Sequence, residues 1–152
     1  MTSLESAVLG DELISTVAAL GRLVRRRLRQ AVPGPPLRGA QLELMRIIEQ
    51  QPGVGITPAA RILHLAANTV STLVDQLIDL GMLVRDTDSS DRRVARLWLT
   101  ETATQRLASG RQARMELMGR VVAGLSAAER EALAQALPTL RALLSSLDSL
   151  ED

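Results

Sequence analysis

The chain has 152 residues, enough for one ordinary domain with a substantial core, and a net charge of +1. Trp98 is its only aromatic residue, which excludes the aromatic platforms on which single-stranded nucleic acids stack. It has no cysteine, which excludes a disulfide framework, a thiolate metal site, a cysteine nucleophile and a thiol redox sensor. Because the net charge is so small, any basic surface must come from segregation of charge.

Residues 1–13 are acidic and lack the basic-then-apolar order of a signal peptide. No apolar run in the sequence is long enough to cross a bilayer. We therefore expect a cytoplasmic protein with no membrane partner.

Apolar residues at steps of three and four predict an amphipathic helix over residues 11–31, which "VPGPP" ends. A stripe of arginines lies roughly opposite the apolar face: Arg22, Arg25, Arg26 and Arg29. Three roles are open to this stripe, namely contact with phosphates, binding of an anionic ligand, or plain solvation. A second helix is predicted over residues 37–50, with an inward face formed by Leu42, Met45, Ile48 and, as an open alternative, Leu44.

Thr57 and Pro58 predict the start of a short helix that reaches residue 63, because threonine can cap a helix and proline suits its first position. Another helix is predicted over residues 68–80, and Gly81 stands where a left-handed residue commonly ends a helix. The apolar face of this helix consists of Val70, Leu73, Val74 and Leu77.

A hairpin is predicted next, with strands at residues 82–85 and 94–99 joined by the polar turn "DTDSSDRR". Thr100 then predicts the cap of a long helix that runs to residue 124. The segment "SAAE", residues 126–129, has the spacing of a capping box and predicts the start of a last helix. Pro138 lies inside that helix and predicts a kink.

This order of elements predicts a mostly α fold with a winged helix-turn-helix at its centre. In such a fold the second helix of the steep helix pair fits the major groove of DNA. The hairpin beside it can reach the adjacent minor groove, where closely spaced phosphates attract a guanidinium.

Residues 56–103 resemble the MarR family of bacterial regulators. The segment "DRRVARLWLT" is similar to the family's wing pattern of Asp-x-Arg followed by Leu-x-Leu-Thr. The segment "NTVSTLVDQLIDLGMLVR" is similar to its recognition helix and the strand that follows. The flanking helices agree in number and order, so the resemblance spans nearly the whole chain.

The resemblance implies a homodimer in which the first helix and the last two interlock. It implies an N-terminal dimerisation helix over residues 1–36, a winged helix-turn-helix DNA-binding lobe over 37–99 and C-terminal dimerisation helices over 100–152. It further implies repression that a small phenolic or anionic effector relieves. Arg93 corresponds to the wing-tip arginine that enters the minor groove, and Asp91 to the acid that braces the wing.

The helix over residues 68–80 departs from the family pattern in its charge. Arginines that are common in the family's recognition helices are replaced here by Ala67, Thr72 and Gln76, and the helix carries Asp75 and Asp79. This departure bears on the strength of DNA binding rather than on the fold.

His64 stands in the turn of the helix-turn-helix, where the family usually has glycine, and histidine enters left-handed conformations more readily than most residues. Ala66, at the cap position of the next helix, is a poor helix starter. As the only histidine, His64 would have to serve any zinc site or Ser-His-Asp triad, and we expect it to be buried in the turn with a structural role. No glycine-rich phosphate loop is present either. We therefore expect neither an enzyme nor a metal or cofactor site.

Two sets of residues are candidates for contact with DNA. The first set lies on the predicted recognition helix and consists of Asn68, Thr69, Ser71, Thr72 and Gln76. Asparagine and glutamine can pair with adenine through two hydrogen bonds, and hydroxyls can bond bases or phosphates. The second set is Arg92 and Arg93 in the wing, for the minor groove. The alternatives are an ordinary solvated helix face and a charged turn that keeps the hairpin soluble.

The sequence thus predicts a ligand-responsive transcriptional repressor that binds a near-palindromic operator as a homodimer, without a cofactor. Its predicted partners are double-stranded DNA, a second copy of the chain and a small phenolic or anionic effector. The alternative is a winged-helix module for protein interaction or small-molecule binding, with weak or no sequence-specific DNA binding. The dependence of DNA binding on sequence and on Arg93 separates the two.

Overall fold

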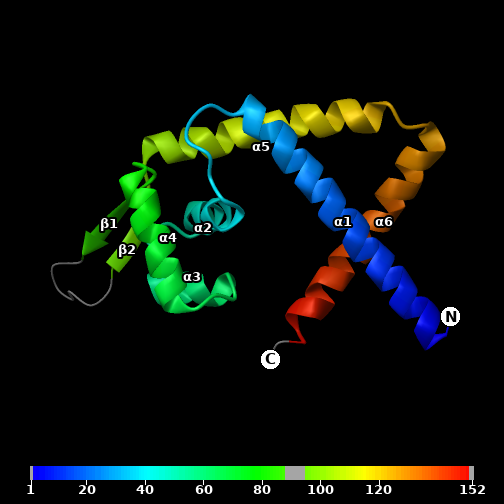
Figure 1. Cartoon of the computed structure of the whole chain (residues 1–152), viewed down its shortest axis with the longest axis horizontal. Helices are drawn as coiled ribbons and strands as arrows, with labels where there is room; N and C mark the ends of the chain where they lie inside the picture. Colours follow the sequence, from blue (N-terminus) through cyan, green and yellow to red (C-terminus); the bar gives the residue numbers. More distant parts are fainter. Residues whose placement is uncertain (1, 88–94, 151–152) are drawn as a thin grey trace. The chain divides into compact units, whose positions relative to one another are not determined.

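The structure is a computed structural model that describes residues 2–87 and 95–150 (Figure 1). Its elements in chain order are α1 Ser3–Ala31, α2 Gly39–Gln50, α3 Ile56–Ile62, α4 Ala67–Asp79, β1 Leu83–Thr87, β2 Ala95–Leu99, α5 Glu101–Ala123 and α6 Ala127–Asp148. The chain divides into two compact units, Met1–Ala113 and Arg114–Asp152, and α5 contributes residues to both. The predicted mostly α fold with a winged helix-turn-helix is confirmed.

Aliphatic side chains of α2, α3, α4 and the hairpin form the core of the first unit. The largest fully buried ones are Leu44, Met45, Ile48, Val70, Val74, Leu77, Leu83 and Leu97. The predicted apolar face of α4 is confirmed in full. On α2, Leu44 and Ile47 are buried, whereas Leu42 is only partly buried against the core. Because α2 contacts α3, α4 and β2, its buried face is wider than one stripe.

Capping boxes begin α1 and α6. The Glu5 amide donates to Thr2 Oγ1 over 3.3 Å, and the Thr2 amide donates to Glu5 Oε2 over 2.6 Å. Since this box satisfies amides at the helix start, α1 begins at Ser3, and the predicted start at residue 11 was wrong. The predicted box of Ser126 and Glu129 at the start of α6 is confirmed.

The starts of α3 and of the hairpin turn also differ from the predictions. Gly55 is the N-cap of α3, so Thr57 is not its cap, and Pro58 is its third residue. The proline is tolerated there because the first four amides of a helix have no intrahelical partner. Strand β1 runs to Thr87, so Asp86 and Thr87 belong to the strand and not to the turn.

Helices α3 and α4 end in the same way. The second residue after each helix has a left-handed backbone, with a φ of 51° at His64 after α3 and 69° at Gly81 after α4. The Met82 amide then donates to the Leu77 carbonyl over 2.8 Å, and residues 65 and 60 are bonded in the same way over 3.0 Å. This is the Schellman motif, which satisfies the last carbonyls of a helix through the backbone alone. His64 is exposed, so the expectation of a buried histidine was wrong: the turn does not need its side chain in the core.

The hairpin is anchored along its β2 edge. Strands β1 and β2 are antiparallel, and the predicted alternation of β2 is confirmed, since Leu97 is buried while Arg96 and Trp98 are exposed. The loop between α2 and α3 runs beside β2: the Gly53 amide donates to the Leu97 carbonyl over 2.9 Å, and the Leu97 amide donates to the Val54 carbonyl over 3.1 Å. The hairpin is therefore held to the helix-turn-helix by backbone bonds.

Thr100 joins the hairpin to the helices on either side of it. Its Oγ1 donates to the carbonyl of Gly81 over 2.8 Å and accepts from the amide of Ala103 over 3.2 Å. The second bond is the predicted cap of α5, which is confirmed. One hydroxyl thus fixes the end of α4 against the start of α5.

Helices α1 and α6 bury none of their described side chains completely. On α1, Leu4 and Leu23 are 76% and 60% exposed, and on α6, Leu144 and Leu147 are 67% and 55% exposed. Pro138 lies inside α6, the last helix predicted from the sequence. Among the described residues, no helix combines the length and the apolarity needed to span a membrane.

We expect Gly81→Ala to lower the free energy of unfolding by about 1 kcal/mol, because a Cβ is strained at a φ of 69°. Gly39→Ala is the control, since Gly39 lies at the start of α2 with open space around it and no positive φ. It should leave stability unchanged or raise it by up to about 1 kcal/mol. Urea unfolding at a fixed protein concentration measures both, and a Gly81→Ala variant as stable as the wild type would contradict the expectation.

Candidate nucleic-acid interface

The face of α4 opposite the core is polar and open. Asn68, Thr69 and Thr72 are exposed, and Ser71 and Gln76 are half-buried at its edges. Residues four apart lie one above the other on a helix, so Asn68 and Thr72 share the middle of this face. All five candidates predicted on the recognition helix are therefore at its surface.

The first turn of α4 supplies its own cap. The N-cap Ala66 makes no side-chain hydrogen bond, and the Thr69 amide donates instead to Asn68 Oδ1 over 2.8 Å. The hydroxyl of Thr72 donates to the Asn68 carbonyl over 3.1 Å. As a result, Asn68 keeps its NH₂ donors free for the solvent side, and Thr72 has used its one proton and presents acceptor lone pairs.

A buried amide connects α4 to α2. Gln41 is 5% exposed. Its Oε1 accepts from the Arg38 amide over 2.8 Å, and its Nε2 donates to Gln76 Oε1 over 3.0 Å. Gln76 is therefore a candidate for DNA contact whose side chain is already bonded to the core of the lobe.

An ion pair connects α4 to the wing. Arg85 Nη2 on β1 lies 3.2 Å from Asp75 Oδ1 on α4. Arg85 faces α4 because it is paired with the buried Leu97 and so shares that face of the hairpin. The pair is partly exposed, so its contribution to stability is small. It does offset one of the two negative charges on α4, while Asp79 has no ion-pair partner among the residues described.

The lobe as a whole is electrically neutral, since residues 37–99 hold seven arginines and seven acidic residues. Arg61 on α3 and Arg96 on β2 are exposed, and no ion pair involves them within the described ranges. Arg38, the N-cap residue of α2, is exposed as well, so these three arginines are the described cations of the lobe without an ion pair within the described ranges. Asp91, Arg92 and Arg93 lie outside the described residues, between the paired Thr87 and Ala95, and their roles stay predictions.

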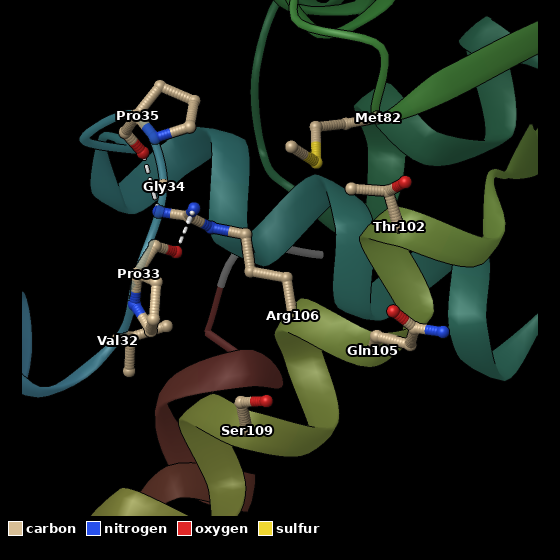
Figure 2. Close-up of a pocket in the computed structure, with 9 residues that line it drawn as sticks. All are labelled: Val32, Pro33, Gly34, Pro35, Met82, Thr102, Gln105, Arg106 and Ser109. Atoms are coloured by element: carbon tan, nitrogen blue, oxygen red, sulfur yellow. Dashed lines mark hydrogen bonds between the residues drawn. The ribbon is translucent and has the colours of Figure 1, made fainter.

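A cavity of about 270 Å³ lies inside the first unit, between the α1–α2 loop and the start of α5 (Figure 2). Arg106 extends from α5 to the loop, where its Nη1 donates to the Pro33 carbonyl over 2.7 Å and its Nη2 donates to the Pro35 carbonyl. Gly34 between them has a φ of 109°, and a Cβ there would lie 2.0 Å from Arg106 Nη1. Burial lowers the pKa of the Arg106 guanidinium, and none of the described residues that line the cavity is acidic.

The polar face of α4, its apolar back and the hairpin beside it define a protein of the winged helix-turn-helix class. A model described as the MarR family matches residues 37–95, which is the lobe that carries α2, α3, α4 and β1. A candidate transcriptional regulatory protein for the hcr operon of Thauera aromatica is 33% identical over 90 residues. That match covers 59% of this chain and 54% of the relative, so the chain aligns with about half of the relative's length.

Solved structures reproduce the fold. A MarR family protein from Bacillus stearothermophilus superposes with a TM-score of 0.77 at 20% identity, covering 95% of this chain and 99% of that one. A MepR mutant from S. aureus bound to an oligodeoxyribonucleotide superposes with a TM-score of 0.63 at 23% identity, covering 90% and 96%. Residues 37–95 therefore match the MarR family in sequence, and nearly the whole chain shares the fold of a solved MarR family protein.

Sequence reasoning missed Gln41, Arg85 and Arg106 as residues that shape the lobe. Gln41 follows Arg38 at the spacing of a capping box, and that local signal could have identified its bond to the Arg38 amide. The bond from Gln41 to Gln76 spans 35 residues, and the bond from Arg106 to the Pro33 carbonyl spans 73. No periodicity in a sequence reports which distant side chains meet.

We expect Asp75→Asn to raise affinity for duplex DNA about three- to tenfold, because it removes a negative charge from the polar face of α4 and frees Arg85. If Arg85 then contacts a phosphate, the slope of log affinity against log salt concentration should become more negative by about one. Fluorescence anisotropy across a salt series measures both quantities.

Glu43→Gln is the matched control for Asp75→Asn. Glu43 on α2 pairs with Arg46 over 2.6 Å, so the variant makes the same change of charge in another arginine pair of the same lobe. It should alter affinity less than twofold. Equal effects of the two substitutions would assign the gain to net charge alone.

Proposed function

We propose that the protein is a cytoplasmic, ligand-responsive transcriptional repressor that binds a near-palindromic operator as a homodimer. The observation that carries this proposal is the polar, exposed face of α4, held on a rigid apolar back beside the hairpin. A helix in this setting fits the major groove, and half-sites lie about one helical turn apart in such dimers. The oligodeoxyribonucleotide bound to the MepR mutant supports DNA as the partner of this fold.

In this proposal α4 reads base edges through Asn68, Thr69, Ser71, Thr72 and Gln76, and Arg92 and Arg93 enter the minor groove. Asp91 braces the wing. Because the lobe has no net charge, the attraction to phosphates is modest, and most of the discrimination comes from hydrogen bonds to bases.

The second copy of the chain covers apolar faces that are exposed in one copy. In the proposal residues 1–36 and 100–152 form the dimerisation helices, and 37–99 the DNA-binding lobe. Single exposed leucines are ordinary on a protein surface, but α1 and α6 each repeat them along most of their length. A face of this kind requires a partner helix, and two-fold symmetry supplies an identical one.

A small anionic effector, of which phenolic acids are one class, fits the cavity beside Arg106. Two guanidinium donors of Arg106 hold the α1–α2 loop, and its remaining N–H groups are free for a carboxylate or phenolate. An anion bound there would compete with the loop carbonyls for Arg106 and so alter how the loop is held against α5. This supports a response to ligand in addition to DNA binding.

We expect Arg93→Ala to weaken binding to the operator at least tenfold, because it removes the guanidinium that enters the minor groove. The measurement is fluorescence anisotropy on duplex DNA from upstream of the protein's own gene, against scrambled duplex, across a salt series. Arg27→Ala is the control, since it removes an exposed arginine from α1, outside the lobe. The wild type should prefer its own duplex about a thousandfold.

The alternative function predicts a different outcome of the same measurement. A protein-interaction or small-molecule-binding module would bind both duplexes weakly, and Arg93→Ala would bind like the wild type. That result would exclude the repressor. Tight binding of an anion without any effect on DNA would favour the small-molecule module.

We expect Leu144→Glu to convert the dimer to a monomer, because a carboxylate on the exposed apolar face of α6 would have to be buried without a partner in the dimer. Sedimentation velocity over a range of concentrations measures the change. Glu131→Gln on the same helix is a control that should remain dimeric. A wild type that sediments as a monomer would contradict the proposed assembly.

A further inference from the structure

We propose that Gln41 locks the side-chain amide of Gln76 so that Gln76 reads guanine and not adenine. The lock holds the Gln76 carbonyl oxygen inward and leaves its NH₂ group to face the major groove. The inference rests on the proposed function, since it names the base class that one position of the operator must present. Glutamine by itself is suited to adenine, so the lock reverses the preference expected from the sequence.

The orientation of Gln41 follows from a backbone group that can only donate. The Arg38 amide is 2.8 Å from one end of the Gln41 side-chain amide, and that end must be the oxygen because two N–H groups cannot bond each other. The NH₂ group of Gln41 is therefore at the other end. Because Gln41 is 5% exposed, water cannot offer its NH₂ group an easy alternative partner.

The orientation of Gln76 follows from that of Gln41. The Gln41 NH₂ group lies 3.0 Å from Gln76, so the atom of Gln76 that faces it must be the carbonyl oxygen. Turning the Gln76 amide over would set two NH₂ groups against each other and leave a buried donor unbonded. Only one arrangement of donors and acceptors is therefore consistent for the hydrogen bonds that link the Arg38 amide, Gln41 and Gln76.

The lock decides which base edge Gln76 can match. Adenine presents an acceptor and a donor in the major groove, N7 and N6, so a two-bond match needs both the oxygen and the nitrogen of the glutamine. Guanine presents two acceptors, N7 and O6, which match the two N–H groups of one NH₂. Since the oxygen of Gln76 is held by Gln41, guanine offers the better pairing, and Gln41 is a positioning residue for it.

The test is a selection of bound duplexes from a randomised DNA library, with the wild type, Gln76→Ala, Gln41→Met and Gln50→Met. The position at which Gln76→Ala loses its base preference is the position that Gln76 reads. Gln41→Met keeps an unbranched side chain of similar size but cannot hold the Gln76 amide. Gln50→Met makes the same change at an exposed glutamine of the same helix and is the matched control.

We expect the wild type to select guanine over adenine at that position by roughly tenfold, which is within the discrimination that one base contact can provide. In Gln41→Met the guanine-to-adenine ratio should fall to about one, because the freed amide can turn its oxygen outward. Gln50→Met should select like the wild type. A loss of stability alone would weaken all sequences equally and leave this ratio unchanged.

Two results would overturn the inference while the proposed function stands. These are selection of adenine at the Gln76 position by the wild type, and an unchanged guanine preference in Gln41→Met. A library from which the wild type selects no sequence would overturn the proposed function and the inference with it. If Gln41→Met does not fold, replacing the selected guanine by 7-deazaguanine tests the wild type directly, and undiminished affinity would overturn the inference.

Discussion

The packing of the apolar face of α4 against α2, α3 and the hairpin is the interaction on which the rest of the lobe depends. Val70, Val74 and Leu77 are fully buried there, so the opposite face of the helix has to be the solvated one. Burial of these side chains fixes the rotation of α4 about its axis and therefore selects which polar residues are presented. The Schellman turns at His64 and Gly81 then fix where the helix begins and ends relative to its neighbours.

Polar contacts at the edges of this core determine the chemistry of the exposed face. The Asn68 side chain accepts from a backbone amide in the first turn of its own helix, and the Thr72 hydroxyl donates to a backbone carbonyl. Asp75 accepts from Arg85, and Gln76 accepts from Gln41. Each of these bonds uses one donor or acceptor that would otherwise be available to a binding partner. With seven arginines and seven acids in residues 37–99, the proposed complex with DNA would gain little from long-range attraction and would depend for its selectivity on the remaining hydrogen-bonding groups.

The helices outside the lobe and the cavity beside Arg106 carry the other two parts of the proposed function, the dimer and the response to a ligand. In the proposed dimer a second copy covers the exposed leucines of α1 and α6, since burial of apolar surface stabilises a helix of that pattern. Arg106 joins the loop after α1 to α5 through two carbonyls, so a change at this one side chain alters how two elements are held.

The sequence by itself determined the elements, because helix and strand periods, caps and glycine positions are local properties. It predicted the buried face of α4, the alternation of β2, the cap by Thr100 and the capping box at Ser126. It misplaced the start of α1, whose capping box is formed by Thr2 and Glu5, and the start of α3, whose N-cap Gly55 lies two residues before Thr57. Only the tertiary structure decided that Gln41 meets Gln76 and that Arg85 meets Asp75. Such pairs depend on how separate elements pack, and no local pattern encodes which donor will be left facing outward.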